Sequence, residues 1–230
     1  MPPTFAETED NAYEAELPQK LSDVTWRVFR IMAEIVEGFE FLATSEREVS
    51  IFGSARFPPG TPWYEEARKL GGMLGKAGFT VITGGGPGIM EAGNRGAYEV
   101  GAPSLGLNIE LPREQRVNPY VTRSRGFHYF FTRKVMLAAA AQAYVFFPGG
   151  FGTLDEAMEL ITLVQTRKMH PLPIILVGKD FWGPFLKWVD ERLVREYETV
   201  SPEDPDIYQL VDTAQEAYDL VVKAPDRSFF

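Results

Sequence analysis

A glycine-rich segment that ends in a carboxylate carries the clearest chemistry in this sequence. After the apolar run 143–147 the chain continues Pro148-Gly149-Gly150-Phe151-Gly152-Thr153-Leu154-Asp155-Glu156. We interpret this as a buried strand, a glycine loop and a helix that starts after Thr153. Unpaired backbone N–H groups and the helix dipole favour an anion at such a helix N-terminus. Glu156, predicted in the first helical turn, would lie beside that anion, which indicates chemistry on a phosphorylated molecule.

A second glycine loop follows the predicted strand 79–83. It runs Thr83-Gly84-Gly85-Gly86-Pro87-Gly88-Ile89-Met90-Glu91 and leads into a predicted helix. It is not the dinucleotide fingerprint, because Ile89 stands where the third glycine would fall, and it is not a Walker A loop, because no Gly-Lys-Ser/Thr follows. Either loop alone fits a tight strand–helix turn equally well. Two such loops at the carboxyl ends of parallel strands favour one mononucleotide-sized ligand.

A basic pair, Arg133 and Lys134, follows Thr132 at another predicted strand-to-helix junction. We expect Thr132 to cap that helix. Two cations at a helix N-terminus oppose its dipole, so the pair indicates a nearby anion, with a solvated basic pair as the alternative. Arg133 can hold a phosphate through two parallel N–H bonds. Three further polar residues are candidate ligand contacts, each with a plain structural role as the alternative: Ser54, Asn108, and Glu159, which shares a helix face with Glu156.

Strands and helices are predicted to alternate from residue 48 onward. Apolar runs predict strands at 49–53, 79–83, 104–109, 127–131, 143–147, 173–177 and near 207–211. Helical spacing predicts helices at 61–77, 88–101, 132–141, 153–167, 182–196 and 213–223. This alternation predicts an α/β fold, with a parallel sheet that has helices on both faces.

The chain divides into three predicted regions. Residues 1–18 are acidic and expected to be mobile, and residues 19–45 form an amphipathic helical extension that either caps the sheet or packs on a partner subunit. Residues 46–224 form a single nucleotide-binding catalytic domain. The loop 111–126, rich in Arg and Pro, is long for such a fold, which fits either a functional loop or a surface excursion.

Composition excludes several classes of function. The net charge of −9 argues against a nucleic-acid partner, and no apolar run is long enough to cross a membrane. Without cysteine there is no disulfide and no thiolate chemistry, and the acidic N-terminus is no signal peptide, so we expect a cytoplasmic protein. The two histidines, His128 and His170, are far apart and show no metal-ligand spacing, so no metal is expected.

Together, segments 84–91, 133–134 and 148–156 resemble the lonely-guy (LOG) family, whose members were formerly described as possible lysine decarboxylases. The resemblance covers roughly residues 48–222, and the motif P-G-G-x-G-T-x-x-E is specific. It implies a Rossmann-like fold and a phosphoribohydrolase. Such an enzyme cleaves the N-glycosidic bond of a nucleoside 5′-monophosphate, AMP or a cytokinin riboside monophosphate, to free base and ribose 5-phosphate. No residue supports a Schiff-base lysine, so no cofactor is expected.

The resemblance also implies residue roles. Arg133 and Glu156 would be catalytic, and many members carry a second glutamate where this chain has Asp155. A homodimer or higher homo-oligomer is expected. The alternative is a nucleotide- or molybdenum-cofactor-binding carrier or sensor without turnover, although such carriers lack the glutamate of the full motif. The resemblance places Gly149, Gly150, Gly152 and Thr153 at the phosphate. We also expect the following residues to bind the substrate: Gly84, Gly85, Gly86, Gly88, Met90 and Lys134.

Overall fold

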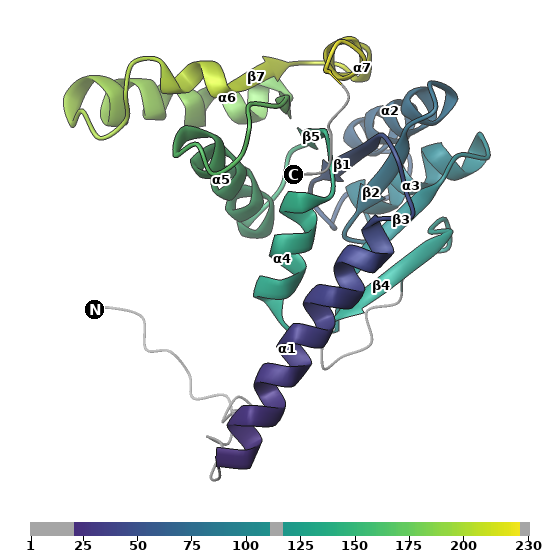
Figure 1. Ribbon diagram of the computed structural model, residues 1–230. Helices are drawn as coiled ribbons and strands as arrows, with labels where there is room; N and C mark the ends of the chain where they lie inside the picture. Colours follow the sequence, from purple (N-terminus) through teal and green to yellow (C-terminus); the bar gives the residue numbers. More distant parts are fainter. Residues whose placement is uncertain (1–20, 111–116, 226–230) are drawn as a thin grey trace, which may run out of the picture.

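The computed structural model describes residues 21–110 and 117–225, so the predicted tail 1–18 and part of the 111–126 loop lie outside the described residues. Figure 1 shows the elements. The strands are β1 (Glu48–Phe52), β2 (Thr80–Thr83), β3 (Ser104–Ile109), β4 (Arg123–Phe127), β5 (Ala143–Phe146), β6 (Ile174–Val177) and β7 (Tyr208–Val211). The helices are α1 (Leu21–Leu42), α2 (Pro62–Lys76), α3 (Ile89–Glu99), α4 (Phe130–Ala139), α5 (Phe151–Gln165), α6 (Lys179–Trp188), the π-helix η1 (Val189–Glu196), the 3-10 helix η2 (Asp204–Ile207) and α7 (Ala214–Val221).

All the strands pair in parallel in one sheet of order β4-β3-β2-β1-β5-β6-β7. The first strand, β1, lies at the centre of the sheet, and β2, β3 and β4 follow outward on one side of it. The chain then crosses back and places β5 on the other side of β1, with Phe52 opposite Phe146. The strand order reverses between β1 and β5, and ligands of open α/β sheets bind outside the strand ends at such a point. The prediction of an α/β fold with a Rossmann-like parallel sheet is confirmed.

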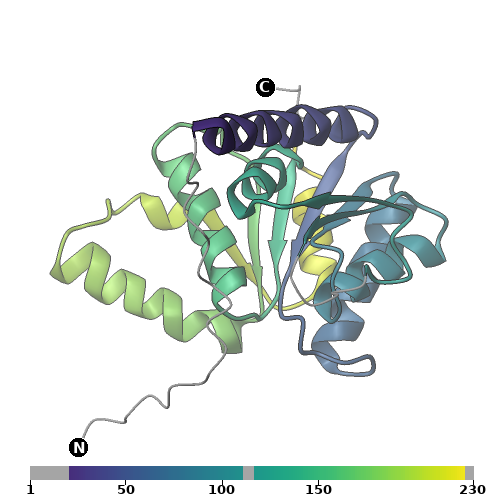
Figure 2. The same cartoon turned by 90° about the horizontal axis from the view of Figure 1, so that it is seen from below.

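Helices cover both faces of the sheet, as Figure 2 shows. One core contains α2, α3 and α7, and the other contains α1, α4, α5 and α6. Successive strand residues point to opposite faces. In β5, Val145 therefore joins the first core while Tyr144 and Phe146 join the second. This is why β5 and β6 are apolar at every position.

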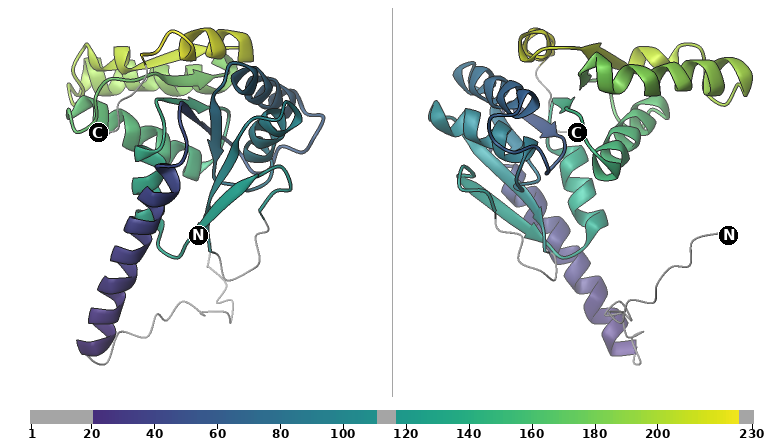
Figure 3. Two further views of the ribbon diagram at one scale, coloured as in Figure 1. Left: turned by 45° about the vertical axis from the view of Figure 1, so that its right-hand side comes forward. Right: turned by 180° about the vertical axis from the view of Figure 1, so that it is seen from behind.

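Helix α1 confirms the predicted extension and runs past the edge of the sheet layer (Figures 1 and 3). Leu42 at its C-terminal end is fully buried. Trp26, Phe29 and Met32, nearer the other end, expose 72%, 55% and 56% of their surface. Within the described residues, no helix is both long enough and apolar enough to cross a membrane.

The predicted strand 127–131 is wrong. Strand β4 ends at Phe127, and α4 already begins at Phe130. The reason is that β4 lies at the sheet edge and pairs only with β3, so Arg123 and Ser124 can stay exposed and no apolar run is needed. The predicted helix 182–196 begins earlier, at Lys179, and changes into a π-helix at Val189.

Candidate active site

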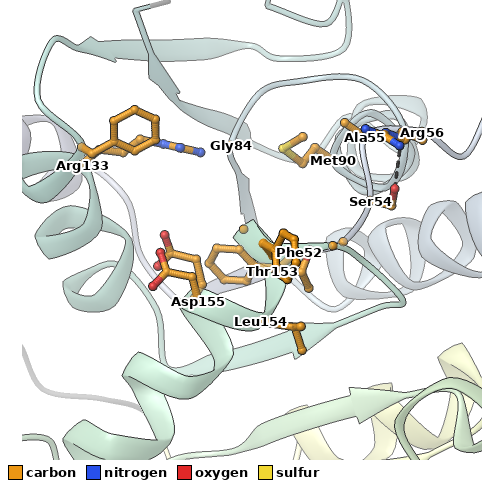
Figure 4. Close-up of a pocket in the computed structure, with 16 residues that line it drawn as sticks. Phe52, Ser54, Ala55, Arg56, Gly84, Met90, Arg133, Thr153, Leu154 and Asp155 are labelled. Carbon is orange, nitrogen blue, oxygen red and sulfur yellow. Dashed lines mark hydrogen bonds between the residues drawn. The ribbon is translucent and has the colours of Figure 1, made fainter. Parts of the chain in front are cut away.

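A cavity of about 680 Å³ opens where the strand order reverses, at the carboxyl ends of β1 and β5 (Figure 4). Its volume suits a small organic ligand. In Figure 4, Arg133 and Met90 lie on one side of the space, with Thr153 and Asp155 across from them. The lining residues are Phe52, Gly53, Ser54, Ala55, Arg56, Gly84, Met90, Phe130, Arg133, Gly150, Phe151, Gly152, Thr153, Leu154, Asp155 and Glu156.

The N-terminus of α5 forms one wall of the cavity. The helix begins at Phe151, with Gly150 as its N-cap, so Thr153 lies in the first turn and Glu156 in the second. The predictions that the helix starts after Thr153 and that Glu156 lies in the first turn are therefore wrong. The N–H groups of Thr153 and Leu154 both donate to the Gly150 carbonyl. Within the described chain no carbonyl accepts the N–H groups of Phe151 and Gly152, which are the helix-terminal donors that bind anions.

Gly149 is needed for this loop to close. A Cβ at this position would overlap the side chain of Thr153. Gly149 itself does not line the cavity, whereas Gly150, Gly152 and Thr153 do. In the predicted phosphate loop, Gly149 therefore packs against Thr153, and Gly150, Gly152 and Thr153 face the cavity.

Glu156 is the buried carboxylate of the cavity wall. Its side chain is only 13% exposed, and Oε1 lies 3.2 Å from the Lys134 ammonium. Burial raises the pKa of Glu156, although the charge of Lys134 opposes this shift. A carboxylate with a raised pKa inside a cavity is a candidate general base.

Lys134 contacts carboxylates rather than the cavity. It extends from α4 to α5, where its ammonium lies 2.8 Å from both Asp155 and Glu159, in addition to Glu156. Burial disfavours the charged ammonium, but hydrogen bonds to Asp155 and Glu159 hold the pKa of Lys134 above its ordinary value. Lys134 does not line the cavity, so the structure places this predicted phosphate ligand beside the carboxylates of α5. Glu159 likewise lies behind the wall.

The Arg133 side chain points into the cavity, and a hydrogen bond at its Nε atom holds it in place. Its Nε donates a 2.8 Å hydrogen bond to the carbonyl of Leu107. Burial lowers the pKa of Arg133, and the charge of Glu156 opposes that shift. Gly84 leaves room for the guanidinium, because a Cβ there would lie 2.5 Å from Nη2 of Arg133 and 2.8 Å from the sulfur of Met90. Gly84, Met90 and Arg133 thus form one corner of the site.

The remaining glycines of the second loop shape it from behind and do not line the cavity. Asn118 binds the loop twice: its N–H donates to the Gly85 carbonyl and its side chain donates to the Gly86 carbonyl. Asn118 in turn donates to Asn94, which is fully buried. Gly88 (φ +69°) caps α3, and Asn108 packs against Gly85 rather than in the cavity.

Glu34 is a buried carboxylate that sequence reasoning missed. It reaches from α1 to the start of α4, where it accepts hydrogen bonds from the N–H groups of His128 and Tyr129 and from the Thr132 hydroxyl. Tyr129 is the N-cap of α4, so the prediction that Thr132 caps this helix is wrong. One signal was present: Glu34 falls at helical spacing from the buried residues Gly38 and Leu42, an unusual place for a charge.

Other residues of the cavity also escaped prediction. Ser54 lines it as expected, and its hydroxyl accepts a 3.1 Å hydrogen bond from the N–H of Arg56, which lines it too. Phe130 and Phe151 lie on its wall with 60% and 92% of their surface exposed.

Among the described residues, no group of His, Asp and Glu side chains could hold a metal ion.

Comparison with known proteins places the chain in a family. The family model described as possible lysine decarboxylase matches residues 90–221. The cytokinin riboside 5′-monophosphate phosphoribohydrolase LOG of Oryza sativa subsp. japonica is 30% identical over 165 residues, which are 70% of this chain and 65% of the rice protein. The cytokinin riboside 5′-monophosphate phosphoribohydrolase LOG3 of Arabidopsis thaliana is 25% identical over 185 residues, which are 79% of this chain and 84% of that protein.

Solved structures share the fold. The molybdenum cofactor carrier protein of Chlamydomonas reinhardtii aligns with a TM-score of 0.60 at 16% identity, over 78% of this chain and 98% of that one. The molybdenum cofactor binding protein of Rippkaea orientalis aligns with a TM-score of 0.59 at 17% identity, over 77% and 96%. Because the family model matches more than half of the residues, the chain belongs to the lonely-guy (LOG) family, whose model is described as possible lysine decarboxylase.

Proposed function

We propose that the protein is a phosphoribohydrolase that cleaves the N-glycosidic bond of a nucleoside 5′-monophosphate to free base and ribose 5-phosphate. One observation carries the proposal: the helix that offers N–H groups to an anion also carries Glu156, a carboxylate of raised pKa, on the wall of the same cavity. The names of the rice and Arabidopsis relatives support the same reaction.

The proposed mechanism starts from the anchored phosphate. The 5′-phosphate binds at the N–H groups of Phe151 and Gly152, and Arg133 supplies a positive charge from across the cavity. Cleavage of the C1′–N bond passes through an oxocarbenium-like state, as in glycoside hydrolysis, and the base leaves with the bonding electron pair and takes up one proton from solvent. Glu156 stabilises that cation and orients and deprotonates the attacking water. The phosphate lies away from the breaking bond, so its binding energy can orient the ribose.

AMP and cytokinin riboside 5′-monophosphates are the proposed substrates. The apolar side chains of Phe52, Met90 and Phe130 on the cavity wall support a purine base, because flat bases pack well against apolar and aromatic surfaces. An N6-linked prenyl group would add apolar area to the same contact. The two substrates differ only in this group, so the relative rates of base release separate them.

The proposal is tested by incubating the purified protein with AMP, with N6-isopentenyladenosine 5′-monophosphate and with adenosine, while free base is followed by liquid chromatography. Both monophosphates should release base far faster than adenosine, because adenosine lacks the phosphate anchor. Equal turnover of AMP and adenosine would refute the phosphate anchor. Tight nucleotide binding without release of base would instead support the carrier or sensor hypothesis, against which Glu156 is the main argument.

We also propose that the protein forms a homo-oligomer through the outer face of α1. Trp26 and Phe29 are too exposed for a face that stays in water, and aromatic side chains of this kind are common in subunit contacts. The N-terminal half of α1 carries Arg27 and Arg30, and the C-terminal half carries Glu40, whereas Glu37 pairs with Arg125 of β4 in the same chain. Antiparallel pairing of two copies of α1 places opposite charges and opposite helix dipoles side by side.

A further inference from the structure

Helix α1 lies outside the strand–helix repeat, yet one of its side chains reaches the element that carries Arg133. The Glu34 carboxylate is 3.0 Å from the N–H nitrogen of His128, 3.4 Å from that of Tyr129 and 2.7 Å from the Thr132 hydroxyl. Only 7% of Glu34 is exposed. Thr132 directly precedes Arg133 in the first turns of α4. The contact therefore joins a helical extension to the side of the cavity that holds the guanidinium.

The chemistry of α4 explains why a carboxylate belongs at this place. Tyr129, its N-cap, offers no side-chain hydrogen bond, so the first turn depends on acceptors from elsewhere. Arg133 and Lys134 lie near the positive end of the helix dipole, which disfavours them. A negative charge from Glu34 at this helix end offsets that repulsion. Its carboxylate accepts the N–H groups of His128 and Tyr129, which lead into the helix, and the Thr132 hydroxyl within the first turn.

We propose that Glu34 is a positioning residue of the active site, which sets the place of Arg133 through the first turn of α4. The Arg133 side chain is fixed at Nε by the carbonyl of Leu107. The position of its backbone depends on the turn that Glu34 holds. If that turn shifts, the guanidinium can no longer meet both the Leu107 carbonyl and a ligand in the cavity. This inference rests on the proposed function in one respect, namely that Arg133 contacts the bound nucleotide.

A double-mutant cycle tests the inference. The dissociation constant of AMP is measured by calorimetry for Glu34→Ala, Arg133→Ala and the double variant, all in a Glu156→Gln background so that the nucleotide is not consumed. Displacement of a positioning group by about 1 Å can weaken function by up to about 100-fold. We therefore expect Glu34→Ala to weaken AMP binding about tenfold when Arg133 is present and less than about twofold when it is absent, because coupled residues are not additive.

Two further variants test the same inference if Glu34→Ala does not fold. Glu34→Gln retains the volume and one acceptor oxygen, and Thr132→Val removes the hydroxyl from the other side of the contact. Both should weaken AMP binding in the same Arg133-dependent way. Glu46→Ala, an exposed glutamate just after the same helix, is the matched control and should leave the affinity unchanged.

The outcomes separate this inference from the proposed function. An equal loss of affinity with and without Arg133, or no loss in Glu34→Ala and Thr132→Val, overturns the positioning role. AMP binding to the native protein without release of base overturns the proposed reaction alone, because the cycle depends only on binding. Absence of AMP binding to the native protein overturns both.

Discussion

The ammonium of Lys134 lies 3.2 Å from Oε1 of Glu156, and both side chains are largely buried. Burial favours the neutral form of this carboxyl group, whereas the lysine charge favours the ionised form, and the net effect is a raised pKa for Glu156. Asp155 and Glu159 share the same ammonium. Lys134 therefore opposes the rise in the pKa of Glu156, the proposed base, even though it does not line the cavity.

Replacement of Lys134 by methionine should move the acidic limb of the pH–rate profile to higher pH. The substitution removes a cation that lowers the pKa of Glu156, so this pKa rises further. The proposed mechanism needs ionised Glu156, so activity is lost as the pH falls through that pKa. The measurement is kcat/KM for AMP against pH, with Lys179→Met, an exposed lysine of α6, as the control. An unchanged acidic limb would argue against ionised Glu156 as the base.

Replacement of Glu156 by glutamine should abolish base release while nucleotide binding stays measurable. The amide keeps the shape of the side chain but cannot take a proton, and general-base catalysis contributes about 100- to 10,000-fold. We expect kcat for AMP to fall by that amount and the AMP dissociation constant to change by less than about fivefold. Glu191→Gln, an exposed glutamate of η1, is the control. Retained activity would remove Glu156 from the mechanism.

Replacement of Gly84 by alanine should weaken nucleotide binding through Arg133. The new Cβ would lie 2.5 Å from Nη2 of Arg133 and 2.8 Å from the Met90 sulfur, so both side chains must move. We expect the AMP dissociation constant to rise about tenfold or more. Gly183→Ala is the matched control, because its Cβ meets open space. Equal affinities of the two variants would show that Arg133 adapts without loss.

Replacement of Asn94 by alanine should destabilise the fold. Asn94 is fully buried and its side chain bonds Thr83, Ser104 and Asn118, so its removal takes one hydrogen-bond partner from each of these buried side chains. An unsatisfied buried group costs about 1–3 kcal/mol, and we expect the free energy of unfolding to fall by roughly 3 kcal/mol. Urea denaturation measures this change against Gln215→Ala, an exposed position on α7. A loss below about 0.5 kcal/mol, the range of ordinary surface changes, would contradict the importance of this network.

Charges placed on the outer face of α1 should separate the subunits of the proposed oligomer. Trp26→Glu combined with Phe29→Glu puts like charges at the proposed contact. Light scattering after size-exclusion chromatography should show a lower molar mass for this variant than for the native protein. Tyr98→Glu, on an exposed aromatic residue of α3, is the control. A native protein that is already monomeric would refute the proposal.

The sheet could be predicted from the sequence where both of its faces are buried. Strands β1, β2, β5 and β6 are buried at every position. The runs of β5 and β6 are apolar throughout, and those of β1 and β2 are interrupted only by buried polar residues. Strand β4 has the sequence Arg123-Ser124-Arg125-Gly126-Phe127, of which only Phe127 is buried, so it leaves no such pattern. The aromatic run that follows looked like a strand but mainly begins α4. A hydrophobic pattern in the sequence indicates buried residues, and an edge strand such as β4 has few buried residues.

The parts of the candidate site that consist of residues close together in the sequence could be predicted. The two glycine loops each join a strand to a helix within a few residues, so their positions follow from the parallel sheet alone. Glu34 is different, because it lies 94 residues before His128 and 98 before Thr132. The role of Lys134 was also hidden, since its carboxylate partners on α5 are known only once α4 and α5 lie side by side. Contacts between distant segments depend on the packing of helices, which the local pattern does not encode.

The reversal of strand order between β1 and β5 has a consequence for the rigidity of the protein. Ser54 and Arg133 come from the part of the chain before β5, and Thr153 and Glu156 from the part after it. A nucleotide in the cavity would bridge the two parts across the seam between these strands. A ligand at 100 times its dissociation constant stabilises a fold by about 2.7 kcal/mol. The amide hydrogens of β1 and β5 should therefore exchange more slowly with solvent when a nucleotide is bound, so that the proposed substrate would also tie the two halves of the sheet together.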